Sequence, residues 1–176
     1  MNTPKKNEKP TLHLLMGLPG SGKTTLGKIL EEITDATYLS SDDYRLMLFK
    51  KPCFSQEEHD MLYATLDHNV LHLLEAGHDV VYDANLNRRH HRQEKYDLAE
   101  KYDAEVKLWW VNTPRKISKK RRAEGQDPRL VPEGETSERM FDRVTKIIEE
   151  PEADEKYTLI DGTDLNKSYV ESKLKD

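Results

Sequence analysis

The sequence predicts an α/β protein built on a parallel β-sheet with helices on both faces. Short apolar runs alternate with longer amphipathic segments along the 176 residues, as strands and helices do in such folds. Polar clusters directly follow the first three predicted strands, where ligands bind in open parallel sheets. No linker, repeat or low-complexity segment divides the chain. We therefore expect one three-layer domain around a five-stranded parallel sheet.

Five segments have the apolar character of buried strands. His13 in the first of them is expected to be a core histidine, because it lies within a buried run. Trp109 and Trp110 point to opposite faces of the fourth, so we expect packing rather than base stacking. The predicted strands are 11–16, 36–40, 78–82, 105–111 and 156–160.

Seven segments have helical character. The third begins with a capping box at Ser55 and Glu58, and its Met and Leu residues at helical spacing indicate core packing. Glycines and prolines interrupt residues 125–135, so we expect a mobile loop there and a lid over about 115–135. The predicted helices are 23–32, a short one ending at 49, 55–76, 88–102, 112–124, 136–150 and a short one after 163.

Composition and charge limit the classes of function. The formal net charge of −5 argues against a general nucleic-acid binder, so such a site must be a local basic patch. A single cysteine, Cys53, excludes an internal disulfide and suits a reducing compartment. No apolar run is long enough to span a membrane, and the polar residues 1–10 are no secretory signal. We expect a cytoplasmic protein with a disordered leader over 1–10, one domain over 11–176, and no membrane or protein partner.

Residues 17–24 match the phosphate-binding loop pattern G-x-x-x-x-G-K-[ST] at every fixed position, between a predicted strand and a predicted helix. Glycines let successive backbone N–H groups turn inward around a phosphate. Lys23 adds a positive charge at the outer phosphates, and the Thr24 hydroxyl can bind Mg²⁺. The sequence therefore predicts a nucleotide site with these contacts: Gly17, Gly20, Ser21, Gly22, Lys23, Thr24 and Thr25.

The polar cluster after the second predicted strand contains the candidate catalytic base. Asp42 lies at the end of a strand expected beside the loop, where a carboxylate could accept a proton from an acceptor hydroxyl. Asp42 and Asp43 could instead cap the following helix, or each could take one of the two roles. Arg45 comes one turn later and faces the same way, so it could bind an anionic acceptor or form a surface ion pair with Asp42.

The cluster after the third predicted strand contains a candidate metal ligand. Asp83 directly follows the apolar run, from where it could reach Mg²⁺ through water or orient Arg45. Ala84 and Asn85 come next, whereas a hydrolytic ATPase often has a glutamate there to activate water. The absence of a second acid favours transfer to an alcohol over hydrolysis, with Asp83 and Asn85 among the contacts to the acceptor.

Positively charged side chains that stabilise the transition state are expected from the basic stretch over residues 115–122 and from Arg129 in the loop that follows. Most of its side chains must form a solvated face, and Arg122 and Arg129, with Arg121 as a further candidate, are expected to include the catalytic cations. A second basic cluster covers residues 88–95. Arg88 at its start could contact phosphates of a substrate, and a solvated face is the alternative reading of the cluster.

Three motifs together resemble a family of P-loop kinases that includes the 5′-kinase domain of bacteriophage polynucleotide kinase, zeta-type toxin kinases and bacterial predicted kinases. The likeness covers about residues 12–140. The motifs are residues 17–25, Ser41-Asp42-Asp43-Tyr44-Arg45 and Tyr82-Asp83-Ala84-Asn85-Leu86-Asn87 followed by Arg88.

The resemblance implies a P-loop NTPase fold with an adenylate-kinase-like sheet, a helical lid, and ATP as phosphate donor. It implies that Asp42 is the general base and that Arg45 contacts the acceptor. The Asp-Thr-Asn of the family corresponds to residues 83–85, with Ala84 in place of threonine. Residues 124–128 interrupt the arginine spacing of the family's lid, so the lid arginine is not carried over.

These observations predict an ATP- and Mg²⁺-dependent kinase that phosphorylates a hydroxyl group. The acceptor could be a nucleic-acid 5′ end or a small alcohol such as a nucleoside, sugar or amino sugar, and a toxin-like kinase is a narrower variant. The alternative function is a nucleotide-binding regulator that hydrolyses ATP or GTP without an alcohol acceptor.

Overall fold

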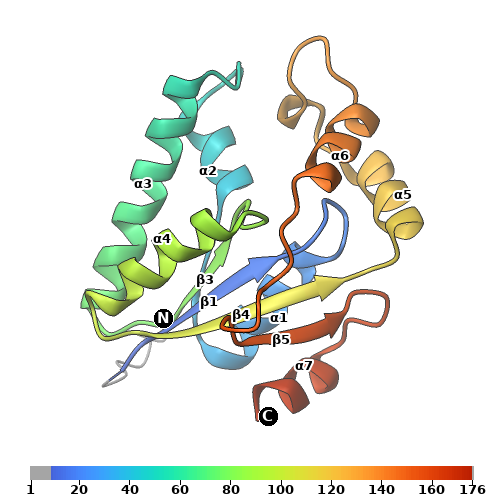
Figure 1. The fold of residues 1–176 in the computed structure, drawn as a ribbon. Coiled ribbons are helices and arrows are strands. Elements are labelled where there is room, and N and C mark those ends of the chain that lie inside the picture. Colours follow the sequence, from blue (N-terminus) through green and yellow to red (C-terminus); the bar gives the residue numbers. More distant parts are fainter. Residues whose placement is uncertain (1–8, 176) are drawn as a thin grey trace.

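The computed structural model describes residues 9–175, which form a five-stranded, all-parallel sheet in the order β2–β3–β1–β4–β5 (Figure 1). The sheet is the one that the sequence predicts, with ends shifted by one or two residues. Residues 1–8 of the predicted leader lie outside the described residues. The strands are β1 (Thr11–Met16), β2 (Thr37–Ser40), β3 (Val80–Asp83), β4 (Glu105–Asn112) and β5 (Tyr157–Asp161).

Helices occupy the connections between the strands, as the alternation in the sequence predicts. The connection between β4 and β5 also contains a short 3₁₀ helix, within the segment 125–135 that the sequence predicts to be a loop. Its N-cap is Asp127, whose Oδ1 accepts a hydrogen bond of 2.9 Å from the backbone N–H of Arg129. The helices are α1 (Lys23–Thr34), α2 (Ser41–Leu48), α3 (Gln56–Glu75), α4 (Arg89–Glu100), α5 (Arg115–Gly125), η1 (Pro128–Leu130), α6 (Ser137–Lys146) and α7 (Lys167–Leu174).

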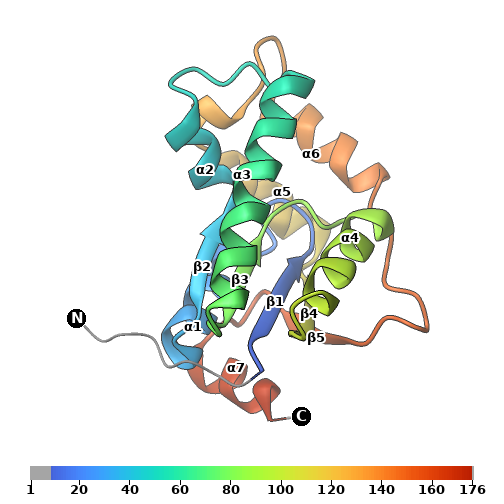
Figure 2. The same cartoon turned by 90° about the vertical axis from the view of Figure 1, so that its left-hand side faces the viewer.

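Side chains of the central strand alternate between two cores. Leu12 and Leu14 of β1 pack with buried residues of α3 and α4 on one face. Leu15 packs with buried residues of α1 and α7 on the other. Figures 1 and 2 show these helix pairs on opposite sides of the sheet. The protein is therefore three-layered, with the sheet in the middle.

His13 is a core histidine, as expected. Nδ1 of its ring accepts a hydrogen bond of 3.0 Å from Nε1 of Trp109, and both side chains are buried. Burial lowers the pKa of His13 to about 4. The ring is therefore neutral near pH 7 and belongs to the packing of the sheet.

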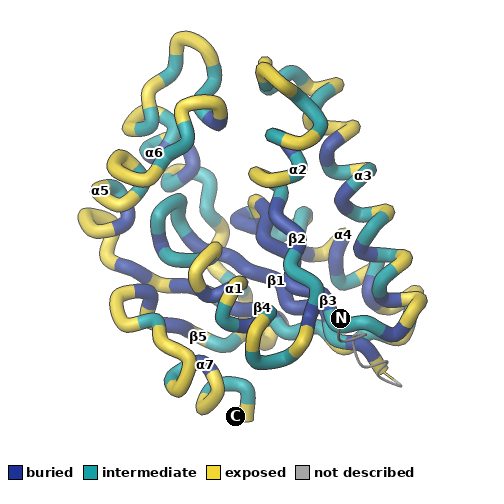
Figure 3. Tube along the Cα trace, turned by 180° about the vertical axis from the view of Figure 1, so that it is seen from behind, coloured by how far each residue is buried: buried dark blue, intermediate teal, exposed yellow. Residues whose placement is uncertain are grey.

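The carboxyl ends of the strands meet below two helical arms. Helices α2 and α3 rise on one side, and α5, η1 and α6 rise on the other (Figure 1). Figure 3 shows buried segments in the sheet and many exposed ones along α5 and the loop that follows it. Within residues 9–175, no helix is long and apolar enough to cross a membrane.

Candidate active site

The phosphate loop connects β1 to α1 in a conformation that requires glycine. Gly17, Gly20 and Gly22 have φ values of 145°, 76° and 113°, in the region that residues with a Cβ rarely adopt. Gly22 is also the N-cap of α1, so the loop runs directly into a helix N-terminus. The first N–H groups of a helix have no partner within it and point toward any anion placed there.

Lys23 lies folded over the loop. Its Nζ donates hydrogen bonds of 3.0 Å to the carbonyl oxygens of Gly17 and Leu18. Burial lowers the pKa of Lys23, and the negative charges of Asp83 and Asp42 oppose that shift. The ammonium group is thus held at the loop by weak neutral acceptors, which a phosphate oxygen can replace.

Segments far along the chain pack against the outside of the loop. Thr113, just after β4, donates from Oγ1 to the carbonyl oxygen of Ser21 at 2.7 Å. Gly162, just after β5, is so close that an added Cβ would lie 2.2 Å from the same oxygen. A Cβ at Gly20 would lie 2.3 Å from the carbonyl oxygen of Ser118 in α5. The lid helix α5 therefore rests directly on the phosphate loop.

Asp83 ends β3 beside the start of α1 and joins two hydroxyl groups. Its Oδ2 accepts hydrogen bonds from Oγ1 of Thr24 at 3.0 Å and from the phenol of Tyr38 at 2.7 Å. Burial and the charge of Asp83 raise the pKa of Tyr38, so the phenol keeps its proton. Hydroxyl and carboxylate oxygens are the ligands that Mg²⁺ prefers. The donor set fits an ion bound by Thr24, with Asp83 in the outer coordination sphere.

Asp42 lies in the first turn of α2, but its strand is not the neighbour of the loop. β3 lies between β1 and β2, so the expected adjacency of these strands is wrong. Ser40 is the N-cap of α2, with its Oγ accepting a hydrogen bond of 3.3 Å from the backbone N–H of Asp43. The helix is thus capped without the side chain of Asp42.

One cavity of about 210 Å³ is lined by Lys23, Thr24, Asp42, Asp83 and Arg122, among others. Burial raises the pKa of Asp42, the positive charge of Arg122 lowers it, and the charge of Asp83 raises it further. Burial also lowers the pKa of Arg122, against the effect of the Asp42 charge. Nε of Arg122 is buried and has no hydrogen-bond partner among the described residues. A carboxylate and an incompletely bonded cation therefore share the cavity with the loop.

A second cavity, of about 490 Å³, continues from Asp42 toward α3. Arg45 is buried in its wall, and its Nη1 makes no hydrogen bond within residues 9–175. The carboxylate of Glu58 is 3.7 Å from that atom, and the guanidinium lies 4.7 Å from the ring centre of Phe54. Phe54 has a φ of 59°, an uncommon conformation for a bulky residue. Arg45 is therefore a fixed, buried cation rather than the surface partner of Asp42.

Some of the other predicted site residues line the two cavities, and others do not. Asn85 lines both, whereas Thr25 and Arg88 line neither. Arg129 is exposed in η1, with its Nη2 2.7 Å from Oδ2 of Asp127. Arg121 donates from Nη1 to the carbonyl oxygen of Gly162 at 2.7 Å. Of the three predicted lid arginines, all within the described residues, only Arg122 lines the cavity with Asp42.

The residues of the site that are missing from the sequence prediction include Tyr38 and Asn87. Tyr38, within β2, holds Asp83 as described above. Asn87, four residues after Asp83, accepts a hydrogen bond on Oδ1 from the backbone N–H of Gly17 at 3.2 Å. The signal for Asn87 was present, because the polar run after β3 extends to it. Nothing in the sequence distinguishes Tyr38 from a packing residue of a strand.

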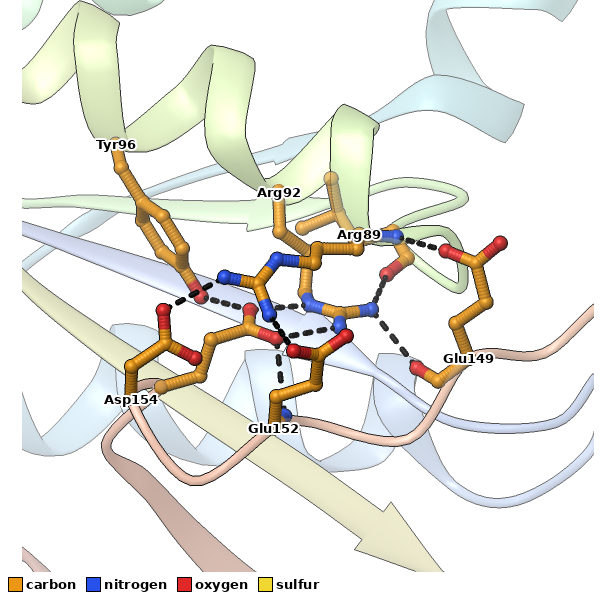
Figure 4. A network of polar contacts seen from close by, with 8 residues as sticks. Arg89, Arg92, Tyr96, Glu149, Glu152 and Asp154 are labelled. Atoms are coloured by element: carbon orange, nitrogen blue, oxygen red, sulfur yellow. Dashed lines mark hydrogen bonds and ion pairs between the residues drawn. The ribbon is translucent and has the colours of Figure 1, made fainter.

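Two cations of the second basic cluster are buried and paired with acids, rather than part of a solvated face. Arg92 is fully buried, and its guanidinium donates to Oε1 and Oε2 of Glu155 at 2.7 and 2.8 Å. Lys95 is buried and donates to Oδ2 of Asp67 at 2.5 Å. Figure 4 shows Arg89 and Arg92 pointing from α4 toward the acidic segment before β5. These cations hold the fold together.

The structure is similar to several solved kinase structures. A presumptive kinase from Chloroflexus aurantiacus superposes with a TM-score of 0.76 and 15% identity, over 96% of this chain and 98% of that one. A chain of the Pnkp1/Rnl/Hen1 RNA repair complex gives a TM-score of 0.66 and 23% identity, over 79% of this chain and 44% of that one. The Mycobacterium tuberculosis APS kinase CysC in complex with AMPPNP and APS gives a TM-score of 0.56 and 18% identity, over 79% of this chain and 97% of that one. At these identities the likeness establishes a kinase-like P-loop fold.

Comparison with curated proteins gives no match. A family model described as an AAA domain matches residues 12–151, which include the phosphate loop, Asp42, Asp83, Arg122 and the whole lid. The match covers most of the chain and both arms above the sheet. The protein is therefore a member of this AAA domain family, with the fold of P-loop kinases.

Proposed function

We propose that the protein is a phosphotransferase that moves the γ-phosphoryl group of ATP to a hydroxyl group of an acceptor, with Mg²⁺ as cofactor. The observation that carries the proposal is the placement of Asp42. Its carboxylate lies between the cavity at the phosphate loop and the second cavity, and it lines both. A donor phosphate on one side and an acceptor hydroxyl on the other would meet at this side chain.

The chain's residues divide the work of the transfer. The loop N–H groups and Lys23 bind the β- and γ-phosphates, and Arg122 stabilises the charge of the moving phosphoryl group. The acceptor oxygen forms a bond to the γ-phosphorus while the bond from that phosphorus to the β,γ-bridging oxygen breaks, and ADP leaves. The proton of the acceptor hydroxyl goes to Asp42. Bound Mg²⁺ would neutralise the phosphate charge and align the donor.

The second cavity supports a bulky acceptor that carries negative charge. Water needs no space of about 490 Å³ beside the base, which weighs against simple hydrolysis. Arg45 presents an incompletely bonded cation in that wall, and Arg143 also lines it, paired at 2.9 Å with Glu135. An anionic group near the acceptor hydroxyl would complete the contacts of Arg45. A 5′-hydroxyl nucleic-acid end and a small phosphorylated alcohol share this chemistry.

The test is a transfer assay with ATP labelled in the γ-phosphate. The acceptors are a 5′-hydroxyl oligonucleotide, nucleoside 3′-phosphates, sugar phosphates, and uncharged nucleosides and sugars. We expect label on an anionic acceptor and none with Lys23→Ala. Transfer to the oligonucleotide that falls steeply with added salt would identify a polynucleotide acceptor. Label that appears only in inorganic phosphate would support the regulatory NTPase instead.

Asp42 and its neighbour provide a matched pair of variants. Asp42→Asn should abolish transfer and leave nucleotide binding close to that of the parent, because the amide cannot accept the proton. Asp43→Asn changes the adjacent residue of the same helix turn, which lines neither cavity, and should retain activity. Equal losses in the two variants would contradict the assignment of Asp42 as the base.

A further inference from the structure

Asn87 connects the phosphate loop to a segment on the far side of the β3–α4 connection. The side chain is buried, with 3% of its surface exposed, and it lines the cavity at the phosphate loop. Its Oδ1 accepts a hydrogen bond of 3.2 Å from the backbone N–H of Gly17. Gly17 also packs closely against β4, where an added Cβ would lie 2.5 Å from the carbonyl oxygen of Val111. The first residue of the loop is thus held between β4 and Asn87.

A helix-capping role does not explain this asparagine. Residues 84–88 precede α4, and asparagine is a common N-cap at such a position. The N-cap of α4 is Arg88, however, and this helix has no side-chain cap. The amide of Asn87 is used instead on a backbone N–H that lies 70 residues away in the sequence.

The backbone of Asn87 is fixed from the opposite side. Its carbonyl oxygen accepts a hydrogen bond of 2.7 Å from the backbone N–H of Glu149. Nη1 of Arg92 donates to the carbonyl oxygens of Leu86 and Glu149, at 3.1 and 3.0 Å. The same guanidinium is held by both carboxylate oxygens of Glu155. Figure 4 shows the contacts of Arg92, which lies between α4 and the segment that contains Glu149.

The segment at Glu149 also follows directly after α6. α6 ends at Lys146, and its residues Met140 and Val144 line the cavity at the phosphate loop. The chain then reaches Glu149 and its hydrogen bond to Asn87 within a few residues. Arg92 therefore joins the segment after α6 and the β3–α4 connection at a single buried point.

We infer that Asn87 is a positioning residue that sets the backbone of the phosphate loop for nucleotide binding, and that Arg92 fixes Asn87 in the required place. Neither residue needs to take part in the chemistry. A buried N–H that loses its acceptor carries a large desolvation penalty, so the loop would move away from the conformation that surrounds a phosphate. The inference rests on the proposed function only in naming the nucleotide as the ligand of the loop.

The first experiment compares Asn87→Leu with Asn87→Asp in the full chain. Leucine has a similar shape without an acceptor, whereas aspartate keeps an oxygen for the N–H of Gly17. The readouts are hydrogen exchange of the Gly17 amide by NMR, the ADP dissociation constant by calorimetry, and the thermal midpoint. Asn112→Leu, at the exposed end of β4, is the matched control.

Asn87→Leu should remove the protection of the Gly17 amide and weaken ADP binding about tenfold, the loss expected for one buried hydrogen bond. Asn87→Asp should keep the amide protected, although its added charge repels ADP. A protected Gly17 amide and unchanged ADP affinity in Asn87→Leu would overturn the inference. If that variant does not fold, Asn87→Ala replaces it, and a loss of protection in Asn87→Asp would equally contradict the inference.

A double-mutant cycle tests the part of Arg92. Arg92→Lys keeps the charge but cannot reproduce the forked contacts of a guanidinium. It should weaken ADP binding in the parent and have little further effect in the Asn87→Leu background, because both act on the same loop position. Independent, additive effects would refute the role of Arg92. ADP binding and amide exchange need no acceptor, so these outcomes stand apart from any failure to detect phosphoryl transfer.

Discussion

The phenol of Tyr38 and the carboxylate of Asp83 are joined by a hydrogen bond of 2.7 Å, and the same carboxylate oxygen accepts the hydroxyl of Thr24. The ring of Tyr38 packs against α1 at Gly27, where an added Cβ would lie 2.4 Å from a ring carbon. A residue of an edge strand thus orients the carboxylate that faces the proposed metal ligand. Outer contacts of this kind tune both the position and the basicity of a metal site.

Tyr38→Phe should raise the apparent dissociation constant of Mg²⁺ about tenfold, because an Asp83 carboxylate that is no longer held by the phenol binds the ion less well. The measurement is the Mg²⁺ dependence of ADP binding or of phosphoryl transfer. Tyr157→Phe, on β5, is the control and should match the parent. A Tyr38→Phe variant with the same Mg²⁺ dependence as the parent would show that this hydrogen bond does not affect Mg²⁺ binding.

The acid limb of the pH–rate profile should report Asp42. The base must be deprotonated, so activity is lost as the pH falls through its pKa, which burial raises above the ordinary value of 3.8. Arg122 lowers that pKa, so Arg122→Met should move the acid limb of the remaining activity to higher pH. Arg129→Met should leave the limb in place. A shift to lower pH in Arg122→Met would contradict the assignment.

Arg122 and Arg129 should differ strongly in their effect on turnover. Arg122→Ala should lower kcat about 10³-fold, which is the lower end of the range for an arginine that stabilises a transferring phosphoryl group. Arg129→Ala should change kcat by no more than about twofold, because exposed ion pairs such as that with Asp127 contribute little. Steady-state kinetics with saturating ATP measures both. Comparable losses would mean that η1 moves into the site during turnover.

The buried pair of Arg92 and Glu155 should set part of the acid stability. The guanidinium of Arg92 lowers the pKa of Glu155 from 4.5 to about 2. This depressed pKa stabilises the native state above pH 4.5, and the contribution is lost as the pH falls from there toward 2. Over that interval it amounts to about 3 kcal/mol. Urea unfolding of the parent and of Glu155→Gln at several pH values should show a steeper loss of stability in the parent than in the variant as the pH falls from 4.5 toward 2.

Local patterns were sufficient to predict the elements that carry the site. The glycine spacing and the flanking apolar runs specified the loop between β1 and α1. Asp42 and Asp83 followed from the rule that ligands gather at the carboxyl ends of parallel strands. Which strands are neighbours was beyond these patterns, because β3 enters between β1 and β2 through contacts that form only in the folded sheet.

Long-range partners account for most of what the sequence did not reveal. Arg92 and Lys95 read as surface cations in a charged helix, and they are buried because Glu155 and Asp67 meet them from other elements. Neutralisation by a distant acid leaves no mark near the basic residue itself. The placement of Arg122, and not Arg129, in the wall of the first cavity has the same origin, since it depends on how α5 lies on the phosphate loop.

Cys53 lines the wall of the proposed acceptor cavity, it is exposed, and the sequence contains no second cysteine. A thiol-reactive fluorophore would therefore label the natural chain at one defined position, without any engineered background. Its emission would respond to molecules that enter beside Arg45 and would leave the nucleotide end of the site free. The protein thus has its own attachment point for an optical screen of acceptor libraries.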